Sequence, residues 1–115
     1  MKCLILITLF LIVATPTLTT AQQKTLETYE AEASEYIKQG RHQEAVEALR
    51  QVTRLKPDDA IAHYYLGIEL NLLGSFSEAS ESLSRVIEMK PKMSEAHREL
   101  SVVRHNLKQY SQAVE

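Results

Sequence analysis

The sequence predicts an all-α fold, an antiparallel helix-pair solenoid of about two and a half repeats. The first observation is the spacing of two similar stretches, "KPDDA" and "KPKMS", whose prolines Pro57 and Pro91 stand 91 − 57 = 34 residues apart. The second is that residues 26–59 align with 60–93 without a gap and share nine identical positions. A third unit begins at Ser94 and continues the register over 94–115. Similarity at a fixed period indicates stacked structural repeats.

The first 21 residues form a separate segment, which we interpret as a signal peptide. Lys2 precedes an apolar run from Leu4 to Ala14, and small residues precede Gln22. This order is typical of secretory signals. Eleven apolar helical residues span about 16 Å, well short of the ~30 Å hydrocarbon core. We therefore expect cleavage near Ala21, a short lead-in over 22–25, and an exported protein, periplasmic or secreted, with no stable membrane span. An uncleaved chain would be membrane-tethered.

Each complete unit is expected to hold two helices. In the second unit, the stripe Leu66, Leu70 and Leu73 has helical spacing and ends at Gly74. Ser75 is a suitable cap for the following helix, and Pro91 ends the pair. Glycine permits the left-handed turn between the helices, and alanine permits close helix packing. The residues predicted to fill these structural positions are Gly40, Ala45, Pro57, Gly67, Gly74, Ala79 and Pro91.

The third unit is expected to be incomplete. Its first helix, "SEAHRELSVVRHNL", carries the apolar residues Leu100, Val103 and Leu107. A partner helix only begins at Tyr110 with "YSQAVE". So short a helix forms few hydrogen bonds to offset nucleation. We therefore expect fraying from Ser94 onward, or self-association through this open end.

These units resemble the tetratricopeptide repeat family. The second unit carries the resemblance best, and the first has Ala33 in place of a glycine and His42 in place of an aromatic residue. The resemblance implies a right-handed superhelix whose concave groove is lined by the first helix of each unit, and a function in binding proteins. The matching residues of the second unit are Leu66, Gly67, Gly74, Phe76, Ala79, Leu83, Val86 and Pro91.

A second apolar stripe on the helix 60–73 is the clearest functional signal. A helix that is apolar all round is either buried on every side or reserves one face for a partner. For any single residue of the stripe, packing against a neighbouring helix is the alternative. The resemblance places this stripe in the groove, together with Glu27, Glu30, Ser34, Ile37 and Glu95 of the flanking units. The predicted partner-binding residues are Ile61, Tyr64, Ile68, Leu72, Arg98, Val102 and His105.

The polar residues form no pattern of an enzyme or a metal site. His63 and His97 occupy the same place in successive units, and packing explains them better than metal binding. Glu30 and Ser34 stand where the family's clamp for a C-terminal carboxylate has lysine and asparagine, so that ligand is not carried over. A net charge of −2 gives no basic surface for nucleic acid. No catalytic residue, metal or cofactor is predicted.

We therefore expect a non-catalytic exported scaffold that binds a protein or peptide partner in its groove. An accessory repeat region of a larger enzyme, or of an envelope assembly or transport machine, is the alternative. A spacer that binds nothing is a third possibility.

Overall fold

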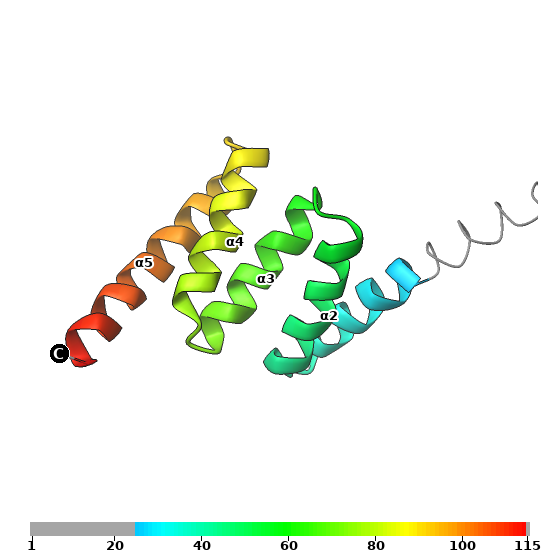
Figure 1. Ribbon diagram of the computed structural model, residues 1–115, viewed down its shortest axis with the longest axis horizontal. Coiled ribbons are helices and arrows are strands. Elements are labelled where there is room, and N and C mark those ends of the chain that lie inside the picture. The colour runs from blue at the N-terminus through cyan, green and yellow to red at the C-terminus, as the bar shows by residue number, and fades with distance from the viewer. Residues whose placement is uncertain (1–24, 115) are drawn as a thin grey trace, which may run out of the picture.

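The computed structural model describes residues 25–114, and within them it is entirely helical (Figure 1). Residues 25–38 form a helical segment, followed by α2 (His42–Leu55), α3 (Ala60–Leu72), α4 (Phe76–Met89) and α5 (Ser94–Val114). Consecutive helices pair antiparallel, which confirms the predicted fold class. The predicted signal peptide, 1–21, and most of the lead-in lie outside the described residues. No helix among residues 25–114 is long and apolar enough to cross a membrane.

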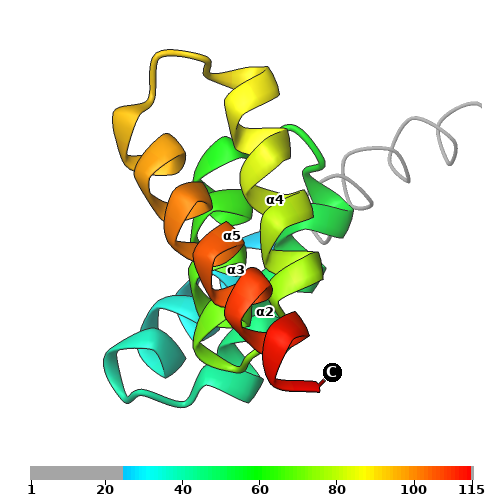
Figure 2. The same cartoon turned by 90° about the vertical axis from the view of Figure 1, so that its left-hand side faces the viewer.

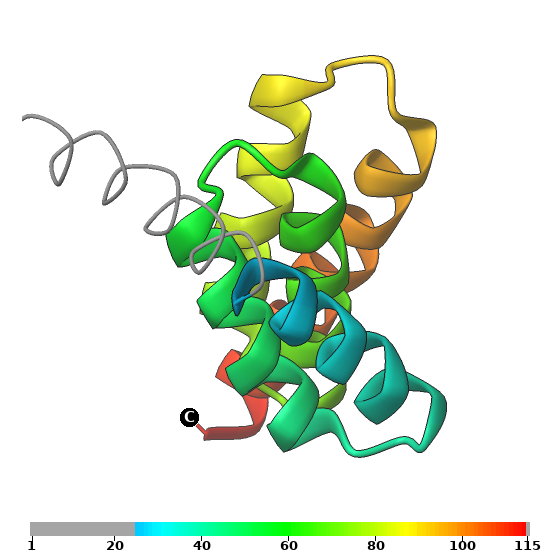
Figure 3. The same cartoon turned by 90° about the vertical axis from the view of Figure 1, so that its right-hand side faces the viewer.

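One continuous core runs through the stacked helices. α3 packs against α2 and α4, and α5 packs mainly against α4. Figure 3 shows the helical segment 25–38, in blue and cyan, beside α2 at the other end of the stack. Leu83 of α4 and Val103 of α5 are completely buried in this core, and Val86 of α4 is completely buried in a smaller cluster with Ala60 and Ala96. Leu66 and Leu70 of the predicted stripe lie in the core, whereas Leu73, just after the end of α3, is 39% exposed.

Glycines form the turns within the first two units. Gly40 has φ 68° and Gly74 has φ 81°, the left-handed conformation that residues with a side chain rarely adopt. The backbone then closes both turns in the same way. The N–H of Arg41 donates to the Tyr36 carbonyl at 2.9 Å, and the N–H of Ser75 donates to the Leu70 carbonyl at 2.9 Å.

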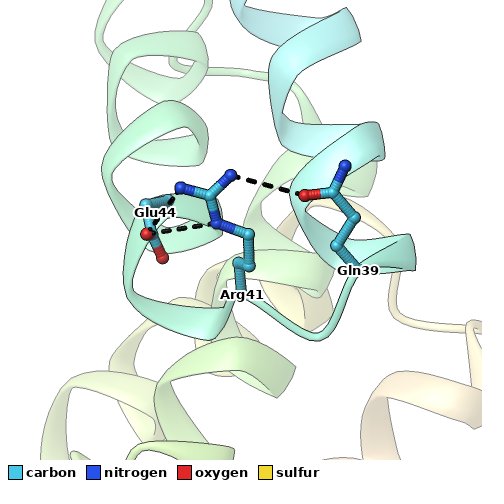
Figure 4. A network of polar contacts seen from close by, with 3 residues as sticks. All are labelled: Gln39, Arg41 and Glu44. Atoms are coloured by element: carbon cyan, nitrogen blue, oxygen red, sulfur yellow. Dashed lines mark hydrogen bonds and ion pairs between the residues drawn. The ribbon is translucent and has the colours of Figure 1, made fainter.

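Side chains secure the helix starts differently from the sequence prediction. Ser75 occupies the N-cap of α4, but its side chain makes no capping bond. The cap that forms is at α3, where Asp59 Oδ1 accepts from the Ala62 N–H at 3.0 Å. At the start of α2, Arg41 donates to the Glu44 carboxylate at 2.9 Å and to Gln39 at 3.4 Å (Figure 4). The Glu44 backbone N–H and Arg41 lower the pKa of the Glu44 carboxyl.

The two histidines of the repeat link each unit to the turn before it. His63 Nε2 is 2.9 Å from the Pro57 carbonyl oxygen, and His97 Nε2 is 2.8 Å from the Pro91 carbonyl oxygen. Since a carbonyl only accepts, the Nε2–H of each ring donates. His63 is buried, as expected of a packing residue, whereas His97 is exposed. The hydrogen bond to the proline carbonyl, and not packing, is therefore the contact that the two positions share.

His42, which replaces the aromatic residue of the family pattern, has a partner on the next unit. Its Nδ1 lies 2.6 Å from a carboxylate oxygen of Glu69. Glu69 is only 3% exposed, so this contact satisfies a carboxyl group inside the stack. The pair joins α2 to α3.

The third unit differs from the sequence prediction. α5 is one unbroken helix over Ser94–Val114, seen along its length in Figure 2, whereas a second helix was expected to begin at Tyr110. The reason is at Lys108, which occupies the register position of Gly40 and Gly74. Without glycine, the left-handed turn is unfavourable and the helix continues. The Tyr110 ring packs edge-on against Phe76, with ring centres 6.2 Å apart. Fraying and self-association stay predictions.

α3 and α4 approach each other closely at Gly67. A Cβ added there would lie 2.6 Å from Leu83 Cγ and 3.3 Å from the Ala79 carbonyl oxygen. Ala79 and Leu83 are both 0% exposed, so neither can move outward. This geometry is what small residues at a helix contact would allow, and the roles of Gly67 and Ala79 stay predictions.

We predict that Gly67→Ala destabilises the chain by up to about 2 kcal/mol. Forcing a methyl group into a packed core costs about 1–3 kcal/mol, and the higher helix propensity of alanine offsets about 1 kcal/mol of this cost. Urea unfolding followed by circular dichroism measures the difference. Ser101→Ala, on the exposed face of α5, is the control and should stay within about 0.5 kcal/mol. A Gly67→Ala variant as stable as the parent would show that Leu83 gives way.

Candidate functional site

A cavity lies between the helical segment 25–38 and α3. Its volume is about 560 Å³, and the helical segment, α3 and α2 all contribute to it. Leu49 and Val52 of α2 form its buried floor, with Ala33 and Ala62 on either side. We call this cavity the first groove. Its remaining lining residues are Glu30, Ser34, Ile37, Lys38, Asp59, Ile61 and Tyr65.

The wall on α3 exposes large apolar side chains. Ile61 is 50% exposed and Tyr65 is 41% exposed, and both line the first groove. Ile37 faces them from the helical segment and is half-buried. Ligand sites are concave and mostly apolar, with a few polar groups that fix orientation. The first groove has this composition, since its polar groups are confined to Glu30, Ser34, Lys38 and Asp59.

Part of the predicted site lies here. Ile61 lines the first groove, and so do Glu30, Ser34 and Ile37, which were expected on the same concave face. Tyr65, however, was not among the predicted residues. It stands four residues after Ile61, a spacing that puts both side chains on one helix face. That spacing is the signal that could have identified it.

Ile68 and Leu72 continue the exposed stripe of α3 beyond the first groove. Ile68 is half-buried and Leu72 is 57% exposed, and neither lines the groove. The apolar stripe of α3 that is at least partly exposed thus consists of Ile61, Tyr65, Ile68 and Leu72. Tyr64, which was predicted to belong to it, lies on another side of the helix.

Tyr64 faces the third unit. It is half-buried against a cluster that includes Ala60, Val86 and Ala96. Its ring meets the Tyr65 ring edge-on, with centres 5.5 Å apart. Burial raises the pKa of the Tyr64 hydroxyl, and the Glu99 and Glu95 carboxylates raise it further.

The predicted residues of the third unit lie apart from the first groove. Arg98, Val102 and His105 are exposed on α5 and do not line it. On this side, α3 and α5 are joined by a hydrogen bond from Asn106 Nδ2 to Asn71 Oδ1 at 3.0 Å. The role of these three residues in binding stays a prediction.

Within residues 25–114, no group of three or more His, Cys, Asp or Glu side chains could hold a metal ion. The first groove itself contains only scattered carboxylate, hydroxyl and ammonium groups. Its arrangement suits recognition of an apolar segment.

We predict that Tyr64 makes the folded chain sensitive to alkaline pH. Its raised pKa means that the folded chain keeps the phenol proton to a higher pH than the unfolded chain does. Above about pH 10 the unfolded state therefore releases this proton first, and stability falls. Urea unfolding at about pH 9 and pH 11 should show a smaller loss for Tyr64→Phe than for the parent. Tyr110→Phe is the matched control on α5. An identical loss in the parent and Tyr64→Phe would contradict the assignment.

Comparison with known proteins agrees with this geometry. Residues 33–68 match the family model of the TPR repeat. No curated protein matches the chain. Among solved structures, the TPR2B domain of yeast Sti1, in a complex with pHsp70, is 26% identical and has a TM-score of 0.68. The match covers 77% of this chain and 71% of that one.

Two further structures show the same architecture. MamA from Desulfovibrio magneticus RS-1 is 25% identical with a TM-score of 0.69, over 77% of this chain and 50% of that one. The chain thus spans about half the length of that MamA structure. The second TPR of Spaghetti (RPAP3), bound to the HSP90 peptide SRMEEVD, is 17% identical with a TM-score of 0.69, over 82% and 89% of the two chains. The described helices therefore have the tetratricopeptide repeat fold, and residues 33–68 carry a repeat of the tetratricopeptide family.

Proposed function

We propose that the chain is a non-catalytic interaction module that binds a peptide segment of a partner protein in the first groove. The observation that carries this proposal is an open apolar cavity of about 560 Å³ with Ile61 and Tyr65 half-exposed on its wall. Exposed apolar side chains gathered in a concave site are typical of a binding surface.

The relatives support a peptide as the ligand. The Sti1 domain is described in a complex with pHsp70, and the RPAP3 domain is described with an HSP90 peptide. The groove of this chain nevertheless has its own chemistry, since Glu30 and Ser34 line it on the helical segment. A carboxylate at this place disfavours a ligand rich in negative charge. We therefore do not extend the HSP90 ligand to this protein.

The contact area implies weak binding by a single segment. Covering Ile37, Ile61 and Tyr65 contributes at most about 4–9 kcal/mol, at 1.5–3 kcal/mol for each large apolar side chain. Association itself costs on the order of 4–15 kcal/mol. A peptide in this groove is thus expected to bind with micromolar or weaker affinity. Such an affinity suits a reversible scaffold.

We also propose that the protein acts outside the cytoplasm. The support is the composition of residues 1–21: a basic start, an eleven-residue run from Leu4 to Ala14 that is apolar except for Thr8, and a small-residue end. After cleavage near Ala21 the mature chain has no cysteine, because Cys3 is the only one. Packing alone would then hold the exported helices together.

We predict that Tyr65→Ala and Ile61→Ser weaken peptide binding about tenfold or more, because each removes apolar contact area from the groove wall. Peptides selected from a displayed random library on the parent chain provide the ligands, and isothermal titration calorimetry measures their affinity. Tyr110→Ala is the matched control, since Tyr110 is an exposed tyrosine of α5, 60% exposed and outside the groove. Circular dichroism checks that all variants are folded.

Two outcomes would contradict binding in the first groove. One is a failure to select any peptide, which would favour the alternative that the chain is a structural spacer without a ligand. The other is a set of peptides that binds Tyr65→Ala and Ile61→Ser as tightly as the parent.

Export predicts a mature protein that begins at or near Gln22. Mass spectrometry of the protein recovered from outside the cytoplasm should show this new amino terminus and no thiol. Recovery of a chain that still contains Met1 or Cys3 would instead indicate a membrane-tethered form.

A further inference from the structure

We infer that the first groove selects an extended segment in which an apolar residue stands between one basic and one acidic residue, at positions i, i+2 and i+4. This inference rests on the proposed function and names the class of peptide that the groove takes. It follows from the placement of two charges on the rim and the apolar wall between them.

Glu30 and Lys38 are the two charges, and both line the first groove from the same helical segment. They are eight residues apart, which corresponds to about 12 Å along a helix axis. Ser34 and Ile37 lie between them on the same face. Both charged side chains are exposed, and among residues 25–114 neither forms an ion pair. Each is therefore free to meet a charge on a ligand.

Asp59 is a third charged residue that lines the groove, but it already has partners of its own. It lines the groove at the start of α3, which runs in the same direction as the helical segment 25–38 (Figure 1). Its carboxylate already accepts the Ala62 N–H and lies 3.9 Å from Lys56 Nζ. Asp59 is thus partly neutralised, and Glu30 supplies the unpaired negative charge. Lys38 at the other end supplies the positive charge.

The ligand's conformation follows from these dimensions. In an extended chain, residues i, i+2 and i+4 point to one side, and i and i+4 are about 13 Å apart. This spacing matches the two rim charges and places residue i+2 midway between them, at the level of Ser34 and beside the apolar side chains that line the groove.

Four capped heptapeptide probes test the rule on the full chain. Each has a central leucine and serine spacers, and the residues two places before and after leucine are Lys/Glu, Glu/Lys, Lys/Lys or Glu/Glu. Both mixed orders are needed because the apolar contact does not fix the peptide's direction. Chemical-shift titration by NMR measures dissociation constants even in the millimolar range.

At least one mixed probe should bind about 2- to 5-fold more tightly than either like-charge probe, as expected for one additional exposed ion pair. Reversing one rim charge should change the preferred probe. Glu30→Lys makes both ends basic and should favour the Glu/Glu probe, whereas Lys38→Glu should favour the Lys/Lys probe. About 1 M NaCl should remove these preferences without abolishing binding, because salt screens exposed charges.

The outcomes separate this inference from the proposed function. If all four probes bind the parent equally and Tyr65→Ala loses them all, the charge rule is wrong and the groove is still the binding site. The rule is also wrong if the charge reversals leave the preference unchanged. If no probe binds while library-selected peptides do, the groove reads a different pattern, and the inference is overturned.

Discussion

The contact of α3 with α4 at Gly67 is the constraint on which the rest of the structure depends. Because a side chain at this position would meet Leu83 at 2.6 Å, only glycine lets the two helices approach this closely without displacing a buried residue. The approach fixes which face of α3 is turned inward. Successive residues are about 100° apart around a helix. Tyr65 is two residues before Gly67, so the two lie about 160° apart, on nearly opposite faces of α3. The groove wall that carries Ile61 and Tyr65 is thus exposed because the opposite face of α3 packs against α4.

Two kinds of polar contact connect the units. One recurs at the start of successive units, and the other joins the first unit to the second. His63 donates to the carbonyl of Pro57, six residues earlier, and His97 donates in the same way to the carbonyl of Pro91. These bonds tie the start of a first helix to the turn that precedes it. His42 and the buried Glu69 add a contact between the first and second units. Stacked repeats contact only their neighbours, so such local contacts carry the order of the whole stack.

The sequence predicted the helix pairs well because glycine, alanine and proline have steric roles that do not depend on distant residues. It failed where a residue departs from the repeat. The register suggested a turn near Lys108, yet the helix continues because lysine does not favour the left-handed conformation of Gly40 and Gly74. In the groove, Tyr64 and Tyr65 both fit a helical stripe with Ile61, since spacings of three and four residues share a face. Only the packing of α5 and of residues 25–38 distinguishes them. The hydrogen-bond acceptors of His63 and His97 were equally unpredictable, because they are backbone carbonyl oxygens.

The adjacent tyrosines Tyr64 and Tyr65 lie on two different sides of α3, one packed and one open. A rotation of about 100° separates them, so Tyr64 turns toward the α5 side and Tyr65 toward the helical segment 25–38. On the first side the space is filled by packing and by the Asn71–Asn106 hydrogen bond. On the second side the helical segment lines an open groove. The two spaces beside α3 therefore differ in kind: the side that faces α5 is occupied by the protein itself, and the other is the open groove for which we propose peptide binding.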